Sequence, residues 1–426
     1  MTVRDRRSRP VVAIVGAGFG GLWAAKALRD APVDVLMIDR RNFHTFYPLL
    51  YQLAAAELEP QSVAYPVRSI FRNQHNVRFL LADVERVEPT ANTLHTSEGP
   101  VRYDYLILTP GSTTNYFGIP GAAEHAWPLR TLEDGMALRD HILSRFEAAA
   151  REPDPERRAK MLTFLIVGGG PTGVEFAGAL SELIVGPLQK DYRELDLHEV
   201  SVVLIEQGPR ILSSYPARLS DWAARRLAKL TVDLRLGEAV EAVEPDGVVL
   251  RGGERLLADT VVWVAGVRGD PAMDAWGLPL GRSGRVVVEP TLQVENAPNI
   301  FVVGDAAVLP DQPLPLVAQV AIQQGKTAAA NIKALLSGQP CRAFRYRNLG
   351  DMAVIGRGAA VFSRGALQLT GFLAWILWAA VHIFNLIGFR NRLVVLATWA
   401  VEYLTFERGS RLLRTPGAAA RLVSAR

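Results

Sequence analysis

Two glycine-rich segments of the chain have the residue types and the spacing that a phosphate-binding turn requires. In "VVAIVGAGFGGLWAAKAL" and again in "MLTFLIVGGGPTGVEFAGAL", a strand pattern meets three spaced glycines and then a small-residue helical pattern. The glycines are Gly16, Gly18 and Gly21 in the first segment and Gly168, Gly170 and Gly173 in the second. In each set the first glycine permits a tight turn, the second admits a pyrophosphate, and the third lets helix and strand pack closely. The helix N-terminus attracts the phosphate charge.

An acidic residue follows each turn at the end of a later strand. Asp39 ends "VDVLMIDR" and Glu206 ends the apolar run of "VSVVLIEQGPRIL", where a carboxylate can accept hydrogen bonds from a ribose. Glu206 lies further from its glycines because "VGPLQKDYRELDLHE" lengthens the intervening segment. Two complete sets indicate two dinucleotides, a resident flavin and an exchangeable nicotinamide cofactor. Glu206 would repel a 2′-phosphate and favours NADH over NADPH, although Arg210 could soften that preference.

Composition excludes several kinds of site. Cys341 is the only cysteine among 426 residues, so an intrachain disulfide, a paired-cysteine redox centre and a four-cysteine iron–sulfur or zinc site are excluded. The length accommodates two or three domains. The apolar segment after the basic N-terminus is broken by glycines, which predicts a strand and not a secretion signal.

The C-terminal part of the chain differs from the rest in charge and apolar character. Residues 365–389, which include "GFLAWILWAAVHIFNLIGF", contain no Lys, Arg, Asp or Glu. Of the formal charge of +4, residues 365–426 carry +5, from seven arginines and two glutamates, and the remainder carries −1. A cationic, apolar tail suits an anionic membrane surface. A solvated helix face is the alternative explanation of the charge.

The chain resembles the two-dinucleotide-binding-domain flavoproteins, which share the glutathione-reductase-like fold. "NIFVVGDAA" matches the Gly-Asp strand of that group with Gly304 and Asp305, and "YLILTPGS" and "VVWVAGV" resemble its crossover strands. Within the group, "DRRNFHTFYPLLYQLAAAEL", "AQVAIQQGK" and the tail "GFLAWILWAAVHIFNLIGFRNR" resemble the type II NADH dehydrogenases, single-chain NADH:quinone oxidoreductases that do not pump protons. The similarity runs from about Val11 to Leu413.

The resemblance implies an α/β fold with two Rossmann-like dinucleotide-binding domains, for FAD and NADH, and a C-terminal helical membrane-anchoring region. The expected ranges are 1–115 for the first part of the FAD domain, 116–284 for the NADH domain with its linkers, 285–365 for the second part of the FAD domain, and 366–426 for the membrane-associated helices. No metal site is expected.

The resemblance also assigns cofactor contacts. Expected FAD contacts are Gly16, Gly18, Phe19, Gly20, Gly21, Asp39, Arg40, His44, Pro48, Val84, Thr109, Gly111, Asp305, Ala318, Gln319 and Val320. Expected NADH contacts are Gly168, Gly170, Pro171, Thr172, Gly173, Glu175, Glu206 and Gly266. Pro110 departs from the family pattern and weakens the assignment of Thr109. His44 could equally serve as a structural hydrogen-bonding residue. Pro48, Leu49 and Tyr51 are expected to wall the isoalloxazine, with ordinary core packing as the rival explanation.

Three residues are candidates for a direct part in the reaction. Glu175 resembles the family's glutamate that holds the nicotinamide carboxamide; complementing the helix macrodipole is its structural alternative. A helix is predicted after Pro313 and Pro315, with its N-terminus toward the flavin, where it would stabilise an anionic reduced ring. Gln319 and Gln323 are four residues apart on that helix and could both reach a quinone carbonyl; a solvated glutamine pair is the alternative.

The apolar tail admits three interpretations. Its 25 uncharged residues are long enough for a membrane span. The resemblance instead implies helices that lie in the membrane plane on the cytoplasmic face, open a tunnel for ubiquinone or menaquinone, and are separated by the charged "GFRNR". Burial in a homodimer interface is the third. Two other functions compete with quinone reduction: reduction of a soluble carrier such as ferredoxin or rubredoxin, and non-catalytic NADH sensing at a membrane.

Overall fold

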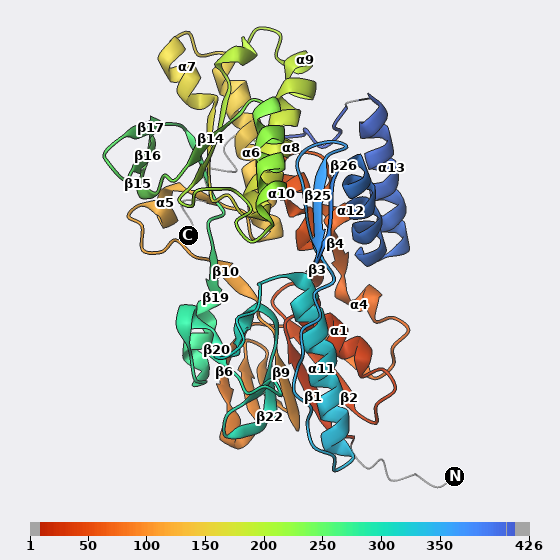
Figure 1. The fold of residues 1–426 in the computed structure, drawn as a ribbon. Coiled ribbons are helices and arrows are strands. Elements are labelled where there is room, and N and C mark those ends of the chain that lie inside the picture. Colours follow the sequence, from red (N-terminus) through yellow and green to blue (C-terminus); the bar gives the residue numbers. More distant parts are fainter. Residues whose placement is uncertain (1–8, 406, 414–426) are drawn as a thin grey trace. The chain divides into compact units, whose positions relative to one another are not determined.

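The chain forms two compact units, each built from three separate stretches of sequence. The computed structural model describes residues 9–405 and 407–413 (Figure 1). The first unit comprises residues up to His44, Tyr65–Thr113 and Val267–Asn348; the second comprises Thr45–Ala64, Thr114–Gly266 and the stretch from Leu349 onward. The expected boundaries 284/285 and 365/366 therefore lie inside these units, and the tail belongs to the second unit. The short strands where the chain passes between the units are β3 (Phe43–Thr45), β4 (Ala64–Pro66), β10 (Ser112–Thr114) and β19 (Val267–Gly269).

A six-stranded sheet forms the centre of the first unit. Its order is β21-β22-β9-β1-β2-β5, and every neighbouring pair is parallel except β21 with β22. The strands are β1 (Val11–Val15), β2 (Asp34–Asp39), β5 (Val77–Leu81), β9 (Tyr105–Leu108), β21 (Gln293–Val294) and β22 (Ala297–Val302). Continuous apolar runs such as "VVAIV" are typical of parallel strands that are covered on both faces.

Two helices pack together in the first unit, as Figure 1 shows: α1 (Phe19–Ala27) and α11 (Ala318–Leu336). They approach closely because a side chain at Gly325 would collide with the backbone oxygen of Gly20. The helix predicted after Pro313 and Pro315 is confirmed as α11. The smaller elements are α4 (Val67–Ile70), the sheet of β6 (Val84–Glu88), β7 (Thr93–Thr96) and β8 (Gly99–Arg102), and the pair β20 (Val286–Val287) and β23 (Ala307–Val308).

The second unit repeats this plan with a five-stranded parallel sheet in the order β11-β18-β12-β13-β14. The strands are β11 (Trp127–Pro128), β12 (Thr163–Val167), β13 (Ser201–Glu206), β14 (Val232–Leu236) and β18 (Thr260–Trp263). The helices are α2 (Leu50–Ala54), α3 (Pro60–Val63), α5 (Ala122–His125), α6 (Leu132–Ala149), α7 (Pro155–Met161), α8 (Pro171–Leu183), α9 (Gln189–Asp191) and α10 (Ala217–Lys229), with a π-helical turn at Ile184–Leu188. A three-stranded sheet of β15 (Val240–Glu244), β16 (Gly247–Leu250) and β17 (Arg255–Leu257) completes this part.

The uncharged run of the tail does not form one long helix. It contains β26 (Leu367–Gly371), the last strand of a sheet with β24 (Asp351–Val354) and β25 (Ala360–Arg364), and then α12 (Phe372–Asn385). Gly371 (φ of 76°) immediately precedes α12. Gly388 (φ of 91°) ends the short segment between α12 and the next helix. Within the described part of the chain, no helix has the length and apolar character needed to cross a bilayer. Residues 367–389 are instead divided among β26, α12, the segment that follows α12 and the first residue of α13.

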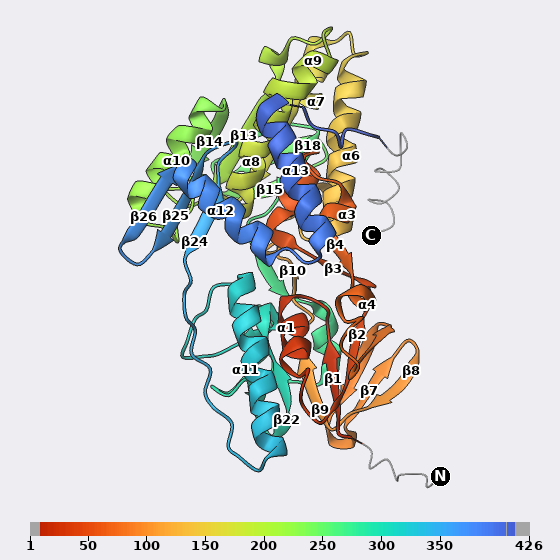
Figure 2. The ribbon, with the colours of Figure 1, turned by 90° about the vertical axis from the view of Figure 1, so that its right-hand side faces the viewer.

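The second tail helix begins earlier than the sequence indicated. Helix α13 covers Phe389–Thr405, so Arg390 and Arg392 lie inside its first turns and not in a break before it. The break is the segment 386–388. Helices α12 and α13 lie side by side, and α13 also contacts α3 (Figure 2). The expected tail arginines at 414, 421 and 426 lie outside the described residues.

Side-chain hydrogen bonds fasten α13 to the body of the second unit. Asn391 Nδ2 donates to the Gln61 carbonyl at 2.8 Å, and Trp399 Nε1 donates to Gln52 Oε1 at 3.0 Å. Asn391 and Trp399 are both buried. Backbone carbonyl oxygens of the short helix α3 accept no hydrogen bond within a longer helix, so they are available to the Asn391 amide. This buried amide therefore fixes the start of α13 to the rest of the second unit.

We expect Asn391→Ala to lower the free energy of unfolding by about 1–3 kcal/mol, because it leaves buried carbonyl oxygens without a donor. Asn385→Ala is the matched control, since Asn385 is only partly buried and its amide donates to Val381 of its own helix. Thermal unfolding of the detergent-solubilised protein measures both. Equal melting temperatures for the two variants would show that the Asn391 amide does not hold the tail.

Candidate functional site

The first glycine turn has the geometry that its spacing predicts. Gly16 has φ of 100°, and a side chain there would collide with the carbonyl of Thr109. A side chain at Gly21 would collide with the Gly16 carbonyl oxygen, whereas the space around Gly18 is open. The turn therefore requires glycine where helix meets strand, and it leaves room where a phosphate would approach.

The second turn has the same construction. Gly168 has φ of 116°, a side chain at Gly173 would collide with the Gly168 carbonyl oxygen, and the space around Gly170 is open. Pro171 and Thr172 are exposed at the start of α8. The repeat predicted from the sequence is thus confirmed at the level of backbone geometry.

The two acidic residues occupy equivalent positions. Asp39 accepts from the backbone N–H groups of Ala17 (2.6 Å) and Arg41 (2.8 Å), and burial raises its pKa above the ordinary value. Glu206 accepts from Gly169 and Gly208, both at 2.7 Å. The longer segment before Glu206 therefore does not displace it. Arg210 directs one guanidinium nitrogen to the Ser213 carbonyl at 3.0 Å.

His44 supplies an orphaned polar atom beside the first turn. Its Nδ1 lies 2.9 Å from the Ala17 carbonyl, and its ring meets Phe19 edge-on with centroids 5.0 Å apart. Burial lowers its pKa to about 4, so the ring is neutral at pH 7. Among the described residues, the buried Nε2 has no hydrogen-bond partner. An open cradle with an unsatisfied buried nitrogen fits a bound dinucleotide.

The remaining expected FAD contacts divide between the two units. In the first, Arg40 pairs with Asp270 at 2.9 Å, Val84 begins β6, Gly111 has φ of 81°, and Asp305 accepts from the Ser112 hydroxyl at 2.7 Å. Pro48 lies in the second unit, in a turn at Tyr47–Leu49 that leads into α2. There Leu49 is fully buried in the core, in agreement with the rival explanation for that residue.

A cavity of about 490 Å³ lies at the start of α11 in the first unit. Gly304, Val320 and Gln324 line it. Sequence reasoning missed Gln324, which is buried and accepts from the Gly304 N–H at 2.6 Å, and Arg285, which donates to the carbonyls of Asp305 and Ala307. Each acts on backbone about 20 positions away, so no local spacing indicated its role, although Gln324 lies within the quoted "AQVAIQQGK".

The glutamine pair of α11 is only partly available to a ligand. Ala318 begins the helix, as expected, and Gln319 follows it. The Gln323 amide is engaged at both ends, donating to the Arg347 carbonyl at 2.9 Å and accepting from the Arg347 N–H at 3.0 Å. A quinone could use Gln323 only by displacing this connection.

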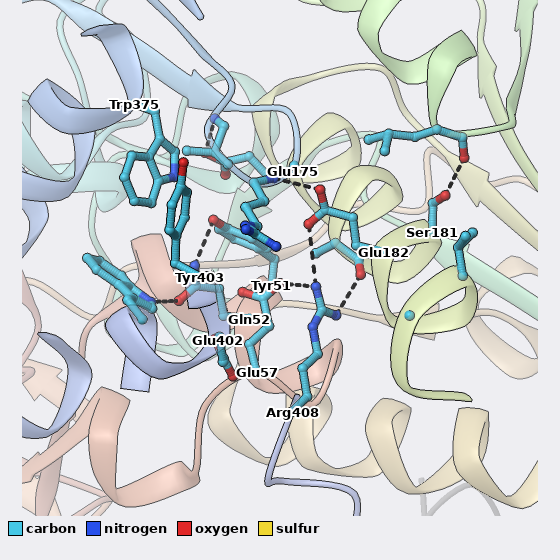
Figure 3. Close-up of a pocket in the computed structure, with 18 of the residues that line it drawn as sticks. Tyr51, Gln52, Glu57, Glu175, Ser181, Glu182, Trp375, Glu402, Tyr403 and Arg408 are labelled. Atoms are coloured by element: carbon cyan, nitrogen blue, oxygen red, sulfur yellow. Dashed lines mark hydrogen bonds and ion pairs between the residues drawn. The ribbon is translucent and has the colours of Figure 1, made fainter. Parts of the chain in front are cut away.

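The second unit contains a larger cavity, of about 570 Å³, that the tail helices help to form (Figure 3). Aromatic side chains make one wall: Trp378 and Trp399 have ring centroids 5.1 Å apart, and Trp375 and Tyr403 have centroids 5.4 Å apart. Tyr51 lies at the cavity as well, and burial raises its pKa. Such walls suit a flat, apolar ligand.

Glu175 lines this same cavity. Its carboxylate accepts one hydrogen bond, from the Val354 N–H at 3.2 Å, and burial raises its pKa to about 8. Glu175 lies beyond the first turn of α8. Simple complementation of the helix dipole therefore does not explain its position. Gly266, the last expected NADH contact, is covered by Phe117, whose ring would collide with any side chain there.

An ionic cluster that sequence reasoning missed closes one side of the cavity. Arg408 is 7% exposed, and its guanidinium donates to the carbonyls of Ala55 (3.0 Å) and Ala179 (2.7 Å). It also pairs with Glu57 at 2.6 Å and lies 3.6 Å from Glu182 (Figure 3). These residues come from segments more than 100 positions apart, so no spacing in the sequence indicated them.

Comparison with known proteins identifies the family. Residues 10–325 match the family model described as pyridine nucleotide-disulphide oxidoreductase. The type II NADH:quinone oxidoreductase Ndh of Mycobacterium tuberculosis is 40% identical, over 98% of this chain and 92% of that protein. NdhA of the same organism, also named a type II NADH:quinone oxidoreductase, is 39% identical over 97% of this chain and 91% of that protein.

The fold agrees with this relationship. The structure of NDH2 from Plasmodium falciparum in complex with NADH superposes with a TM-score of 0.87 at 19% identity, covering 94% of this chain and 99% of that one. The α/β architecture of the pyridine nucleotide-disulphide oxidoreductases, expected from the sequence, is confirmed. The chain belongs to the type II NADH:quinone oxidoreductases.

We expect Gly173→Ala to destabilise the protein by about 1–3 kcal/mol and to raise the KM for NADH, because the new methyl group forces α8 away from its strand. Gly170→Ala is the matched comparison. With open space and a φ of −72°, alanine at position 170 should leave the melting temperature unchanged while obstructing the approach of a phosphate. A normal melting temperature for Gly173→Ala would contradict the packing argument.

Proposed function

We infer that this chain is an FAD-dependent enzyme that takes a hydride from NADH and passes the electrons to a quinone. The observation that carries the inference is the doubled glycine turn, each copy completed by a backbone-bound carboxylate. The family relationship over nearly the full length supports it. FAD and NADH are the two dinucleotides, and FAD supplies the capacity to accept a hydride and release electrons. The protein supplies orientation and a dry environment.

We assign the first turn to FAD and the second to NADH. The α1 N-terminus and the carboxylate of Asp39 would hold the FAD pyrophosphate and ribose, and α8 with Glu206 would hold NADH in the same way. An exchangeable cofactor bound by Glu206 is expected to be NADH, since a 2′-phosphate would meet its negative charge. Glu175 is the proposed contact for the nicotinamide carboxamide.

The proposed entry for quinone is the 570 Å³ cavity of the second unit. Its tryptophans offer flat apolar faces, and its glutamates offer polar groups at one side. As a proposal that does not depend on this cavity, the Gln319 amide of α11 in the first unit stabilises a quinone oxygen as charge develops on it. Gln323, held by Arg347, is then proposed to position the helix that carries Gln319.

We propose that the tail helices lie in the surface of the cytoplasmic leaflet. Several large apolar side chains of α12 and α13 are exposed: Phe372, Leu373, Ile376, Val381, Phe384, Phe389, Leu393, Val394, Leu396, Val401 and Leu404. An exposed apolar surface of this kind marks a membrane or protein interaction site. Arg390 and Arg392 at the start of α13 add charge that favours anionic lipid. The alternative is a homodimer in which a second copy of the chain buries the same side chains.

Gln319→Ala should slow quinone reduction about 100-fold, the effect of losing one donor to a developing oxyanion, while anaerobic bleaching of the flavin by NADH stays at the wild-type rate. Stopped-flow absorbance measures the two half-reactions separately. Gln339→Ala, an exposed glutamine just beyond the same helix, is the control. An equal loss in both half-reactions would remove Gln319 from the acceptor side.

Phe384→Glu combined with Leu404→Glu should abolish sedimentation with anionic vesicles, because each exposed apolar side chain contributes about 1.5–3 kcal/mol when it leaves water. Activity with a short-chain quinone should persist. Leu257→Glu, exposed on β17 of the same unit, should change nothing. If the double variant still binds vesicles but changes from dimer to monomer, the surface joins two copies and does not contact lipid.

A further inference from the structure

Two carboxyl groups of the cavity wall, Glu402 and Glu57, differ in their partners. Glu402 of α13 has a side-chain oxygen that is shielded from solvent and, in the described part of the chain, has no hydrogen-bond partner. Glu57, which follows α2, is buried and pairs with Arg408 at 2.6 Å. Figure 3 shows Glu402, Glu57 and Arg408 at the same side of the cavity.

The cluster holds more negative than positive charge. The guanidinium of Arg408 acts on Glu57, Glu182 and Glu402. Glu182 also has Arg226 at 4.0 Å, so two cations stand against three carboxylates, and Arg408 is the cation that Glu57 and Glu402 share. Burial, and then the charge of Glu57, raises the pKa of Glu402 to about 9. Burial also raises the pKa of Glu57 to about 7, although Arg408 opposes it. At pH 7 Glu402 therefore carries a proton, and Glu57 exchanges one readily.

Other charged groups around the cavity are too dispersed to reverse this balance. They are Glu175 on α8, Arg226 and Lys229 on α10, Arg357 after β24, and Glu407 after α13. Arg226 is directed to the backbone carbonyls of Ile355 and Arg357 and lies 4.0 Å from Glu182 alone of the cluster, and Glu407 pairs with Lys190 at the surface. Glu175 adds to the negative side.

A second observation indicates that this cavity receives a hydrogen-bond acceptor. Trp378 lines it and is 1% exposed, yet its indole N–H has no acceptor among the residues that the structure describes. Buried indole N–H groups usually find a partner. A ligand with a flat ring and carbonyl oxygens would satisfy that N–H and stack on the neighbouring tryptophan. A quinone has both features.

The reaction requires a proton from water. In the balance NADH + H⁺ + quinone → NAD⁺ + quinol, both quinone oxygens gain hydrogen, and NADH supplies two electrons but only one proton equivalent. Trp378 and Trp399 of the apolar wall are buried, so a quinone against them has little access to bulk water, and a side chain beside them is placed to deliver the second proton. The donor must be protonated at pH 7 and border the quinone.

We propose that Glu402 is the proton donor to the quinone and that Glu57 passes protons from water to Glu402. The proposal rests on the proposed function of the cavity. As electrons from NADH reach the quinone, a lone pair of its oxygen forms an O–H bond, and the O–H bond of Glu402 breaks with its electron pair left on the carboxylate. Glu57 then returns a proton to Glu402 and takes one from water. Glu402 is the catalytic residue, and Glu57 acts through it.

The test replaces the carboxyl group by an amide of the same size. Glu402→Gln should lower kcat with a short-chain quinone at least tenfold, leave the KM for quinone within about threefold, and leave anaerobic flavin reduction by NADH unchanged. In the wild type, kcat should fall as pH rises through about 9, because only the protonated acid donates. Glu402→Gln should lack this decline, and Glu402→Asp, which keeps an acid, should retain it with intermediate kcat.

Glu124→Gln, an exposed glutamate of α5, is the matched control and should behave as the wild type. A wild-type kcat and pH profile for Glu402→Gln would overturn the proposal. If that variant fails to retain FAD, Glu402→Asp decides: a lowered kcat with the alkaline decline retained supports the proposal, and a wild-type kcat overturns it. A wild-type protein that NADH bleaches but no quinone reoxidises would instead contradict the proposed function itself.

Discussion

The structure depends on two places where a helix approaches a strand more closely than any side chain permits. At Gly21 and Gly173 the backbone of the helix lies against a carbonyl oxygen of its own turn, and the first glycine of each turn takes a positive φ. This approach aims the helix N-terminus at the space beside the second glycine, where a pyrophosphate binds. The carboxylates of Asp39 and Glu206 stabilise the turns by accepting backbone hydrogens. The proposal of two dinucleotide sites follows from this repeated geometry.

A second constraint is the burial of Arg408 near the end of the described chain. Removing a guanidinium from water is costly unless every donor finds a partner. Here two carbonyls and two carboxylates provide those partners, and they come from α8 and from the segment after α2. The contact fixes the end of α13 to the body of the second unit, and α12 and α13 then contribute the tryptophans of the cavity. The same cation opposes the rise that burial gives to the pKa of Glu57 and of Glu402.

Much of the fold could be predicted from the sequence because its signals are local. The glycine spacing, the apolar strands and the helix after Pro315 all appear in the structure where the sequence placed them. The course of the tail could not be predicted in the same way. The length of an uncharged run does not show where the backbone turns. Here Gly371 and Gly388, both with positive φ, divide the tail into a strand, a 14-residue helix and a second helix. The cluster of Glu57, Glu182, Glu402 and Arg408 was missed because its members meet only through tertiary packing. Gln323 looked available on its helical face, but the Arg347 backbone, 24 residues away, engages its amide.

The account requires that one bound flavin takes electrons from NADH and releases them to a quinone. The most direct measurement is the visible spectrum of the purified protein, titrated without oxygen first with NADH and then with a quinone. The account predicts a yellow protein whose flavin absorbance disappears on the addition of one equivalent of NADH and returns on the addition of one equivalent of quinone. A colourless protein that does not take up FAD would contradict it.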